Sequence, residues 1–211
     1  MKKIFTILSA ALMLLAGTNA FAQMSVGAGY VNSTNSLKIG KNSDASTTAI
    51  NGFYAGVGYT IPISSLINFT PGVYYEFLAN KNVSGDEITV SGALTEHYLN
   101  IPLTFSVGGS VAPGIRLFAF AGPTATVGLA STTDSNLNLG GVISVGGKTN
   151  NYDNSDYGRF DVMLGGGAGI QFSNVRLTVG YDYGMLNRYT GDSDSISRHT
   201  SRLHVGLGFA F

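Results

Sequence analysis

The chain has 211 residues, a formal net charge of zero, no cysteine and no tryptophan. Only 11% of its residues are charged, whereas an average soluble domain is about 25% charged. This low charge argues against a disordered chain, which combines high charge with low hydrophobicity, and against a nucleic-acid binder, which needs a basic patch. The absence of cysteine excludes disulfide scaffolds, cysteine-based zinc sites and cysteine nucleophiles. Two classes remain: a soluble all-β protein, or a β-barrel whose outer face meets lipid.

The first 22 residues have the three parts of a cleaved secretory signal peptide. A short basic start at Lys2 and Lys3 leads into an almost wholly apolar segment over 4–16 and then a small-residue site that ends at Ala22. The apolar segment is too short for a membrane anchor, which needs about 20 residues. We predict cleavage between Ala22 and Gln23. Loss of Lys2 and Lys3 leaves ten basic residues against 12 acidic ones, so the mature chain has a net charge of −2.

The remaining residues, 23–211, form one domain in which apolar and polar side chains alternate. A period of two is typical of a β-strand with one buried or lipid-facing side, and no amphipathic helix of useful length is present. Eight strands are expected, over 24–31, 53–61, 67–78, 96–107, 115–129, 159–172, 175–184 and 202–211. Segment 115–129 is apolar on both faces, because Phe118 and Phe120 interleave with other apolar residues, so its facing stays open.

The connections between these segments alternate strictly between long and short. They contain about 20, 5, 15, 7, 29, 2 and 14 residues, and Ser173-Asn174 has the length of a tight hairpin turn. An even strand number with alternating short turns and long loops is typical of a transmembrane barrel, whose closed sheet leaves no unpaired edge in lipid. The pattern predicts an all-β, eight-stranded antiparallel up-and-down transmembrane β-barrel in the outer membrane of a Gram-negative bacterium, with both termini periplasmic.

The composition of the two strand faces indicates which one meets lipid. The polar face consists mainly of glycine, threonine, serine, asparagine and tyrosine and has no lysine. A water-exposed protein surface would instead be rich in lysine and glutamate. Small polar residues suit the narrow lumen of an eight-stranded barrel, and the bulky face suits lipid, with aromatic residues near the strand ends. A soluble periplasmic carrier barrel, with its apolar face inside, is the alternative.

Isolated charged residues interrupt the polar face. The expected cluster in the lumen comprises Glu76, Glu96, Arg176, Asp182, Arg202 and His204. A closed barrel brings the last strand beside the first, so these side chains could meet across the lumen. Buried charges must be paired, which favours a structural plug. The functional alternatives are a proton or ion path and a pair of catalytic carboxylates.

Other polar residues suggest weaker hypotheses. His199 and Ser201 share one strand face, as in an outer-membrane lipid hydrolase, but no acidic residue has the spacing to orient the histidine. The acids expected in loops are Asp134, Asp153, Asp156, Asp192 and Asp194. The stretch 191–194 lacks the full ligand spacing of a calcium loop. We therefore predict no catalytic residue, no metal site and no cofactor. The longest connection, 130–158, is expected to be either a binding surface or disordered.

Several motifs resemble an outer-membrane β-barrel domain family common in Bacteroidota and related to PorT-type barrels. The motifs are His97-Tyr98-Leu99-Asn100-Ile101-Pro102-Leu103, Ala121-Gly122-Pro123, Gly165 to Gly169 and Tyr181 to Asn187. The resemblance implies an eight-stranded barrel of OmpA-like or OmpX-like shape and little about activity. The last apolar series resembles the signal read by the barrel assembly machinery, and consists of Leu203, Val205, Leu207, Phe209 and Phe211.

Together these features predict a non-enzymatic outer-membrane barrel. Its expected partners are outer-membrane lipid, the barrel assembly machinery and an extracellular or envelope protein bound through the outer loops, with no nucleic acid. The expected role is envelope structure or surface binding. A lipid-modifying hydrolase and the soluble carrier remain the alternatives.

Overall fold

The structure, a computed structural model, describes residues 24–40, 45–84, 88–139, 143–153, 157–191, 193 and 195–211. The expected cleavage site between Ala22 and Gln23 lies outside these residues. Within the described ranges, no helix is both long enough and apolar enough to cross a membrane.

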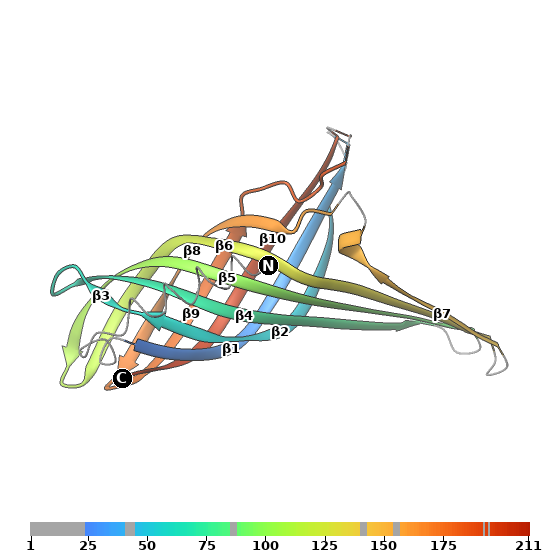
Figure 1. The fold of residues 1–211 in the computed structure, drawn as a ribbon. Coiled ribbons are helices and arrows are strands. Elements are labelled where there is room, and N and C mark those ends of the chain that lie inside the picture. The colour runs from blue at the N-terminus through green and yellow to red at the C-terminus, as the bar shows by residue number, and fades with distance from the viewer. Residues whose placement is uncertain are drawn as a thin grey trace, which may run out of the picture.

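Eight strands close into a ring, which confirms the predicted antiparallel barrel (Figure 1). The strands are β1 (Met24–Ile39), β2 (Ser46–Tyr59), β3 (Ile61–Pro62), β4 (Ile67–Ser84), β5 (Ile88–Ala112), β6 (Ile115–Leu139), β7 (Ile143–Asn150), β8 (Phe160–Phe172), β9 (Val175–Gly184) and β10 (Ile196–Ala210). The ring runs β1-β2-β4-β5-β6-β8-β9-β10 and returns to β1, and every pairing is antiparallel. The short β3 pairs with β4, and β7 adds to β6 outside the ring.

One end of the barrel, which we call the turn end, carries the short connections. The turns Pro113–Gly114 and Ser173–Asn174 lie there, and Gly114 and Ser173 adopt positive φ angles of 74° and 51°. The backbone N–H of Phe211 donates to the carbonyl of Met24 at 3.0 Å, so the chain's last residue and the start of β1 meet at this same end. Tight turns therefore close one end, and all long excursions leave from the other.

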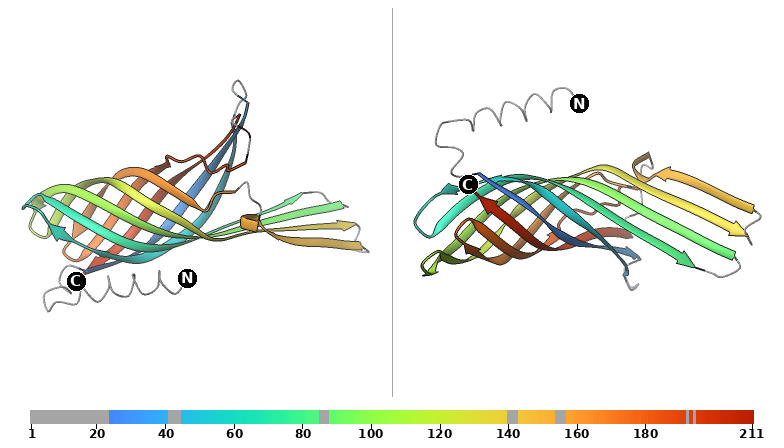
Figure 2. Two further views of the ribbon diagram at one scale, coloured as in Figure 1. Left: turned by 45° about the horizontal axis from the view of Figure 1, so that its top comes forward. Right: turned by 90° about the horizontal axis from the view of Figure 1, so that it is seen from below.

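At that other end, the arm end, the strands continue well beyond the ring (Figure 2). The long arm consists of the outer parts of β4, β5 and β6 together with β7, paired in that order. The expectation that 130–158 is a connection was wrong, because 130–139 belongs to β6, 143–150 forms β7, and Asn151–Asp153 forms a short 3₁₀ helix. Residues 131–136 are all polar, and apolar and polar residues alternate again only briefly at 137–139 and 143–145, so the sequence there lacks a run long enough to identify a strand.

The barrel is apolar outside and polar inside. Leu207, an outward residue of β10, is 61% exposed, whereas Glu76 on β4 is completely buried in the lumen. In segment 115–129, the structure settles the open facing: Leu117 points outward, and Phe118 and Phe120 line the lumen. This arrangement suits lipid and is the reverse of a soluble carrier barrel.

Glycine leaves room for the inward aromatic rings. A side chain at Gly206 or Gly29 would collide with the ring of Tyr54, and one at Gly167 would collide with Phe120. Each inward ring thus fills the volume that its neighbours' side chains would need. The high glycine content follows from packing large rings in a narrow lumen.

The first prediction concerns the lipid face. Leu207→Arg should lower the free energy of unfolding in lipid vesicles by about 2–4 kcal/mol, because it puts a charge into hydrocarbon. Urea unfolding followed by tyrosine fluorescence measures this. Thr149→Arg, on the exposed long arm, is the matched control and should change stability little. Equal stability of both variants would contradict a lipid-facing Leu207.

Candidate functional site

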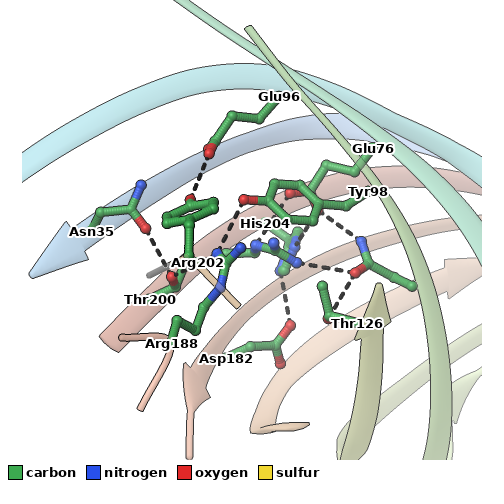
Figure 3. A network of polar contacts seen from close by, with 12 residues as sticks. Asn35, Glu76, Glu96, Tyr98, Thr126, Asp182, Arg188, Thr200, Arg202 and His204 are labelled. Carbon is green, nitrogen blue, oxygen red and sulfur yellow. Dashed lines mark hydrogen bonds and ion pairs between the residues drawn. The ribbon is translucent and has the colours of Figure 1, made fainter. Parts of the chain in front are cut away.

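Four of the predicted charged residues meet in the lumen near its middle (Figure 3). The Arg202 Nε lies 3.1 Å from Glu76 Oε1. The His204 ring lies between two carboxylates, with Nδ1 3.3 Å from Asp182 Oδ2 and Nε2 3.9 Å from Glu76 Oε2. These side chains converge because Arg202 and Asp182 are paired across β10 and β9, while Glu76 approaches from β4 on another wall of the barrel.

A neutral side chain, Asn100 on β5, connects this group. Its Nδ2 donates to Glu76 Oε2 at 2.9 Å, and its Oδ1 accepts from Arg202 Nη1 at 3.0 Å and from Thr126 Oγ1 at 2.8 Å. The Arg202 guanidinium also lies 4.6 Å from the centre of the Tyr98 ring. We call Glu76, Asn100, Asp182, Arg202 and His204 the charge plug. Its multiple partners offset the cost of removing the charges from water.

The charge plug adjoins a small apolar cluster in the lumen. Val31, Ile50, Leu78 and Tyr98 are almost completely buried and pack together. Tyr98 belongs to this cluster and also faces Arg202, so it joins apolar and charged layers. The cluster excludes water from one side of the charges, which strengthens their attraction.

Glu96 lies in a separate group nearer the arm end. Its Oε1 accepts hydrogen bonds from Tyr157 Oη at 2.8 Å and from Ser131 Oγ at 3.2 Å. The β5–β6 register shifts by one residue between His97 and Tyr98. This shift reverses which residues of β6 face the lumen, so Ser131 points inward. Burial, and then the charge of Glu96, raise the pKa of Tyr157 to about 12, which keeps this phenol protonated and donating at physiological pH.

Arg188, from the segment after β9, links the two groups and was not predicted. Its Nη1 donates to Tyr98 Oη at 3.0 Å and to Thr200 Oγ1 at 3.3 Å, and its Nη2 donates to the carbonyl of Gly158 at 3.1 Å. Its guanidinium lies 4.8 Å from the Tyr157 ring centre. We call Arg188, Tyr157 and Gly158 the arm-end cap, because their contacts connect the segment before β8 to the segment after β9.

Arg176 lies apart from the other predicted charges. It is six residues before Asp182 on β9, a separation of about 20 Å along a strand, and it is paired with Gly208 near the turn end. Its guanidinium lies 5.3 Å from the Phe118 ring centre, and Nη2 donates to Gln171 Oε1 at 3.3 Å. The structure therefore brings Glu76, Asp182, Arg202 and His204 together, joins Glu96 to them through Tyr157 and Arg188, and leaves Arg176 outside.

The residues of the hydrolase hypothesis are placed differently from a catalytic pair. The His199 Nδ1 lies 3.1 Å from the carbonyl oxygen of Gly184, and its ring stacks on Tyr183 with centres 5.8 Å apart. Neither ring nitrogen of His199 has a serine hydroxyl or carboxylate partner among the described residues. Within the described ranges, no three metal-ligating side chains are grouped. Asp156, Asp192 and Asp194 lie outside those ranges.

The second prediction tests the buried ion pair. Arg202→Met should lower the free energy of unfolding by about 3–5 kcal/mol, since it leaves the Glu76 charge buried without its main partner. Adding Glu76→Gln should recover part of that loss. Urea unfolding in vesicles provides the double-mutant cycle, with Arg159→Met at an exposed position as control. Additive losses in the double variant would show that the two side chains do not interact.

The third prediction concerns the arm-end cap. Arg188→Ala should raise hydrogen exchange of the Gly158 amide, which donates to the Arg188 carbonyl, by about tenfold or more, because the side chain that holds the two segments together is gone. Exchange measured by NMR in nanodiscs gives the rate. Lys38→Ala, at an exposed position of β1, should leave it unchanged. An unchanged Gly158 rate in Arg188→Ala would refute the cap.

The solved structures that match this chain have low sequence identity to it. Ail, the attachment invasion locus protein of Yersinia pestis, solved with the heparin analogue sucrose octasulfate, is 16% identical with a TM-score of 0.37; the match covers 89% of this chain and 98% of Ail. Neisserial surface protein A is 16% identical with a TM-score of 0.38 (89% and 97% covered). The outer membrane enzyme PagL is 11% identical with a TM-score of 0.40 (88% and 99% covered).

Sequence comparison assigns the family. No curated protein matches the chain significantly. The family model described as "Outer membrane protein beta-barrel domain" matches residues 18–191, which is most of the chain. The chain therefore belongs to the outer membrane protein β-barrel domain family.

Proposed function

We propose that this outer-membrane barrel is a non-enzymatic surface protein that binds an extracellular protein through its long arm. The observation that carries the proposal is the outer edge of β7. In the described part of the chain, β7 pairs only with β6, along Ile143–Asn150, so its other edge has no strand beside it. An unpaired strand edge offers a row of backbone donors and acceptors to which another extended chain can add.

The surface of β7 supports a polar protein partner. Residues 146–150 are all exposed, and they comprise two glycines, Lys148, Thr149 and Asn150. Small and polar side chains leave the backbone accessible and keep the edge soluble in water. Backbone hydrogen bonds would supply the affinity, and the exposed side chains would select the partner.

The lumen supports a binding role over transport. The charge plug and the arm-end cap occupy the space between the walls at the middle and the arm end, and an eight-stranded barrel is too narrow for a water-filled channel. The buried network thus acts as a rigid base from which the strands of the long arm project. The outward His199, bonded to a backbone carbonyl, gives no support to the hydrolase alternative.

The proposal includes how the chain is exported and assembled. Cleavage between Ala22 and Gln23 would release the chain into the periplasm, where the assembly machinery would read its last strand. The outward exposure of that strand's apolar series supports this role, and the series is Leu203, Val205, Leu207, Phe209 and Phe211. We also propose that the chain is related to the PorT-type barrels of Bacteroidota, and the motif over 97–103 supports this.

The fourth prediction tests orientation, with the turn end in the periplasm and the arms outside. The lysines of the mature chain are Lys38, Lys41, Lys81 and Lys148. Lys38, Lys81 and Lys148 lie on the arm-end parts of β1, β4 and β7. A membrane-impermeant amine reagent should therefore label Lys148 on intact cells. Labelling that appears only after the outer membrane is permeabilised would reverse the orientation.

The binding role is tested by shortening the long arm. Residues 83–91 and 135–147 would each be replaced by Asn-Gly, since Asn82 and Gly92, and likewise Asp134 and Lys148, are cross-strand partners. Cells displaying the wild-type chain should adhere to surfaces coated with serum proteins, and cells displaying the shortened chain should not. Heat-modifiable gel mobility confirms that the barrel is folded. Equal adhesion of the two, or no adhesion by either, would contradict the proposal.

A further inference from the structure

The half of the lumen between the charge plug and the turn end contains a cavity of about 220 Å³. Glu76, Asp182, Arg202 and His204 line its inner end, and Ser25, Ser106 and Ala210 line it where the strands end. The function proposed for the long arm does not use this space. An engineered cavity of about 150 Å³ binds benzene, so the volume here is sufficient for a substituted aromatic ring.

Flat aromatic side chains form much of the cavity wall. Phe118 and Phe120 on β6 have ring centres 6.3 Å apart, and Tyr54 and Tyr74 meet edge to face at 5.9 Å. Glycines on the neighbouring strands give these rings their room, as at Gly206 and Gly167. The wall is therefore shaped for an apolar, flat body. Pockets of this kind are specified by a few polar groups placed among apolar ones.

The charged side chain at the turn-end part of this cavity is Arg176. The acids at the inner end are engaged by Arg202 and His204, but among the described residues Arg176 has no carboxylate partner. Within the described ranges, its Nη2 donates to the neutral Gln171 Oε1 at 3.3 Å, and its buried Nε has no hydrogen-bond partner. Arg176 is half-buried, and a guanidinium that loses water needs an anion or a full set of hydrogen bonds, as Arg188 has; Arg176 has neither among the described residues.

A second arginine adds to the positive charge at the turn end. Arg116 lies on the other side of Gln171 in the strand register, and its Nη2 donates to the carbonyls of Leu66 and Gly108. The hydrogen bonds of both arginines to other described residues thus go to neutral oxygens. The described acidic side chains lie at the charge plug or farther toward the arm end.

We propose that this cavity binds a small amphipathic organic carboxylate that enters from the turn end. The carboxylate pairs with the Arg176 guanidinium, whose planar fork matches it, and the apolar body lies between the rings of Phe118, Phe120 and Tyr74. The charge plug closes the inner end, so the ligand is held and does not pass through.

The probe for a test is 4-(trifluoromethyl)benzoate, with the mature chain folded in nanodiscs and binding followed by ¹⁹F NMR. The wild-type chain should bind it saturably above the signal of empty nanodiscs. Arg176→Gln should weaken binding about tenfold or more, because the charge-assisted hydrogen bonds are lost. Arg159→Gln, the matched substitution at the arm end, should bind as the wild type does. The neutral 4-(trifluoromethyl)benzyl alcohol should bind the wild type as weakly as the benzoate binds Arg176→Gln.

A second variant tests the cavity itself. Thr104 lines it, so Thr104→Phe should fill the space and abolish binding while gel mobility shows a folded barrel. The proposal is overturned if the wild-type signal equals that of empty nanodiscs, or if Arg176→Gln binds the benzoate as tightly as the wild type. It is also overturned if a folded Thr104→Phe retains full affinity.

Discussion

The closure of the sheet is the constraint on which the rest of the structure depends. Hydrocarbon offers no hydrogen-bond partners, so every backbone group in the membrane must be paired within the protein, and β10 must return to β1. Closure with eight strands then fixes a narrow lumen. It also reverses the usual arrangement of side chains, because the apolar face meets lipid and the polar face is enclosed.

The enclosed polar side chains must be paired and packed inside the lumen, and they are arranged there in three layers. Rings line the turn-end half, where glycines make room for them, paired charges occupy the middle, and Arg188 joins the segments over the arm end. The middle and the cap are joined through Tyr98, which contacts both Arg202 and Arg188. Of the two described arginines that line the cavity, Arg202 pairs with Glu76, whereas Arg176 has no carboxylate partner and a buried Nε without a hydrogen bond, which is why a ligand is inferred beside Arg176 and not at the plug.

The sequence predicted the barrel but not the full length of its strands, and it predicted which charges face inward but not where they meet. Alternation identifies a strand only where apolar and polar residues follow each other over at least about four residues, so it misses 131–136 of β6, which are all polar. Alternation also does not tell how far along the barrel axis an inward residue lies. The sequence therefore predicts Arg176 and Asp182 in one cluster, although six residues separate them on β9. Arg188 lies outside regular alternation, and the register shift that turns Ser131 toward Glu96 leaves no recognisable pattern in the sequence.

The inverted arrangement of the two faces is tested most directly by methyl NMR in nanodiscs that contain a lipid spin-labelled within its acyl chain. Methyl signals of Leu177, Val179 and Leu207, which point outward, should be strongly broadened. Those of Val31, Ile50 and Leu78, which are buried beside the charge plug, should remain sharp. Equal broadening of the two sets, or broadening of the second set alone, would contradict a closed barrel with a lipid-facing apolar surface.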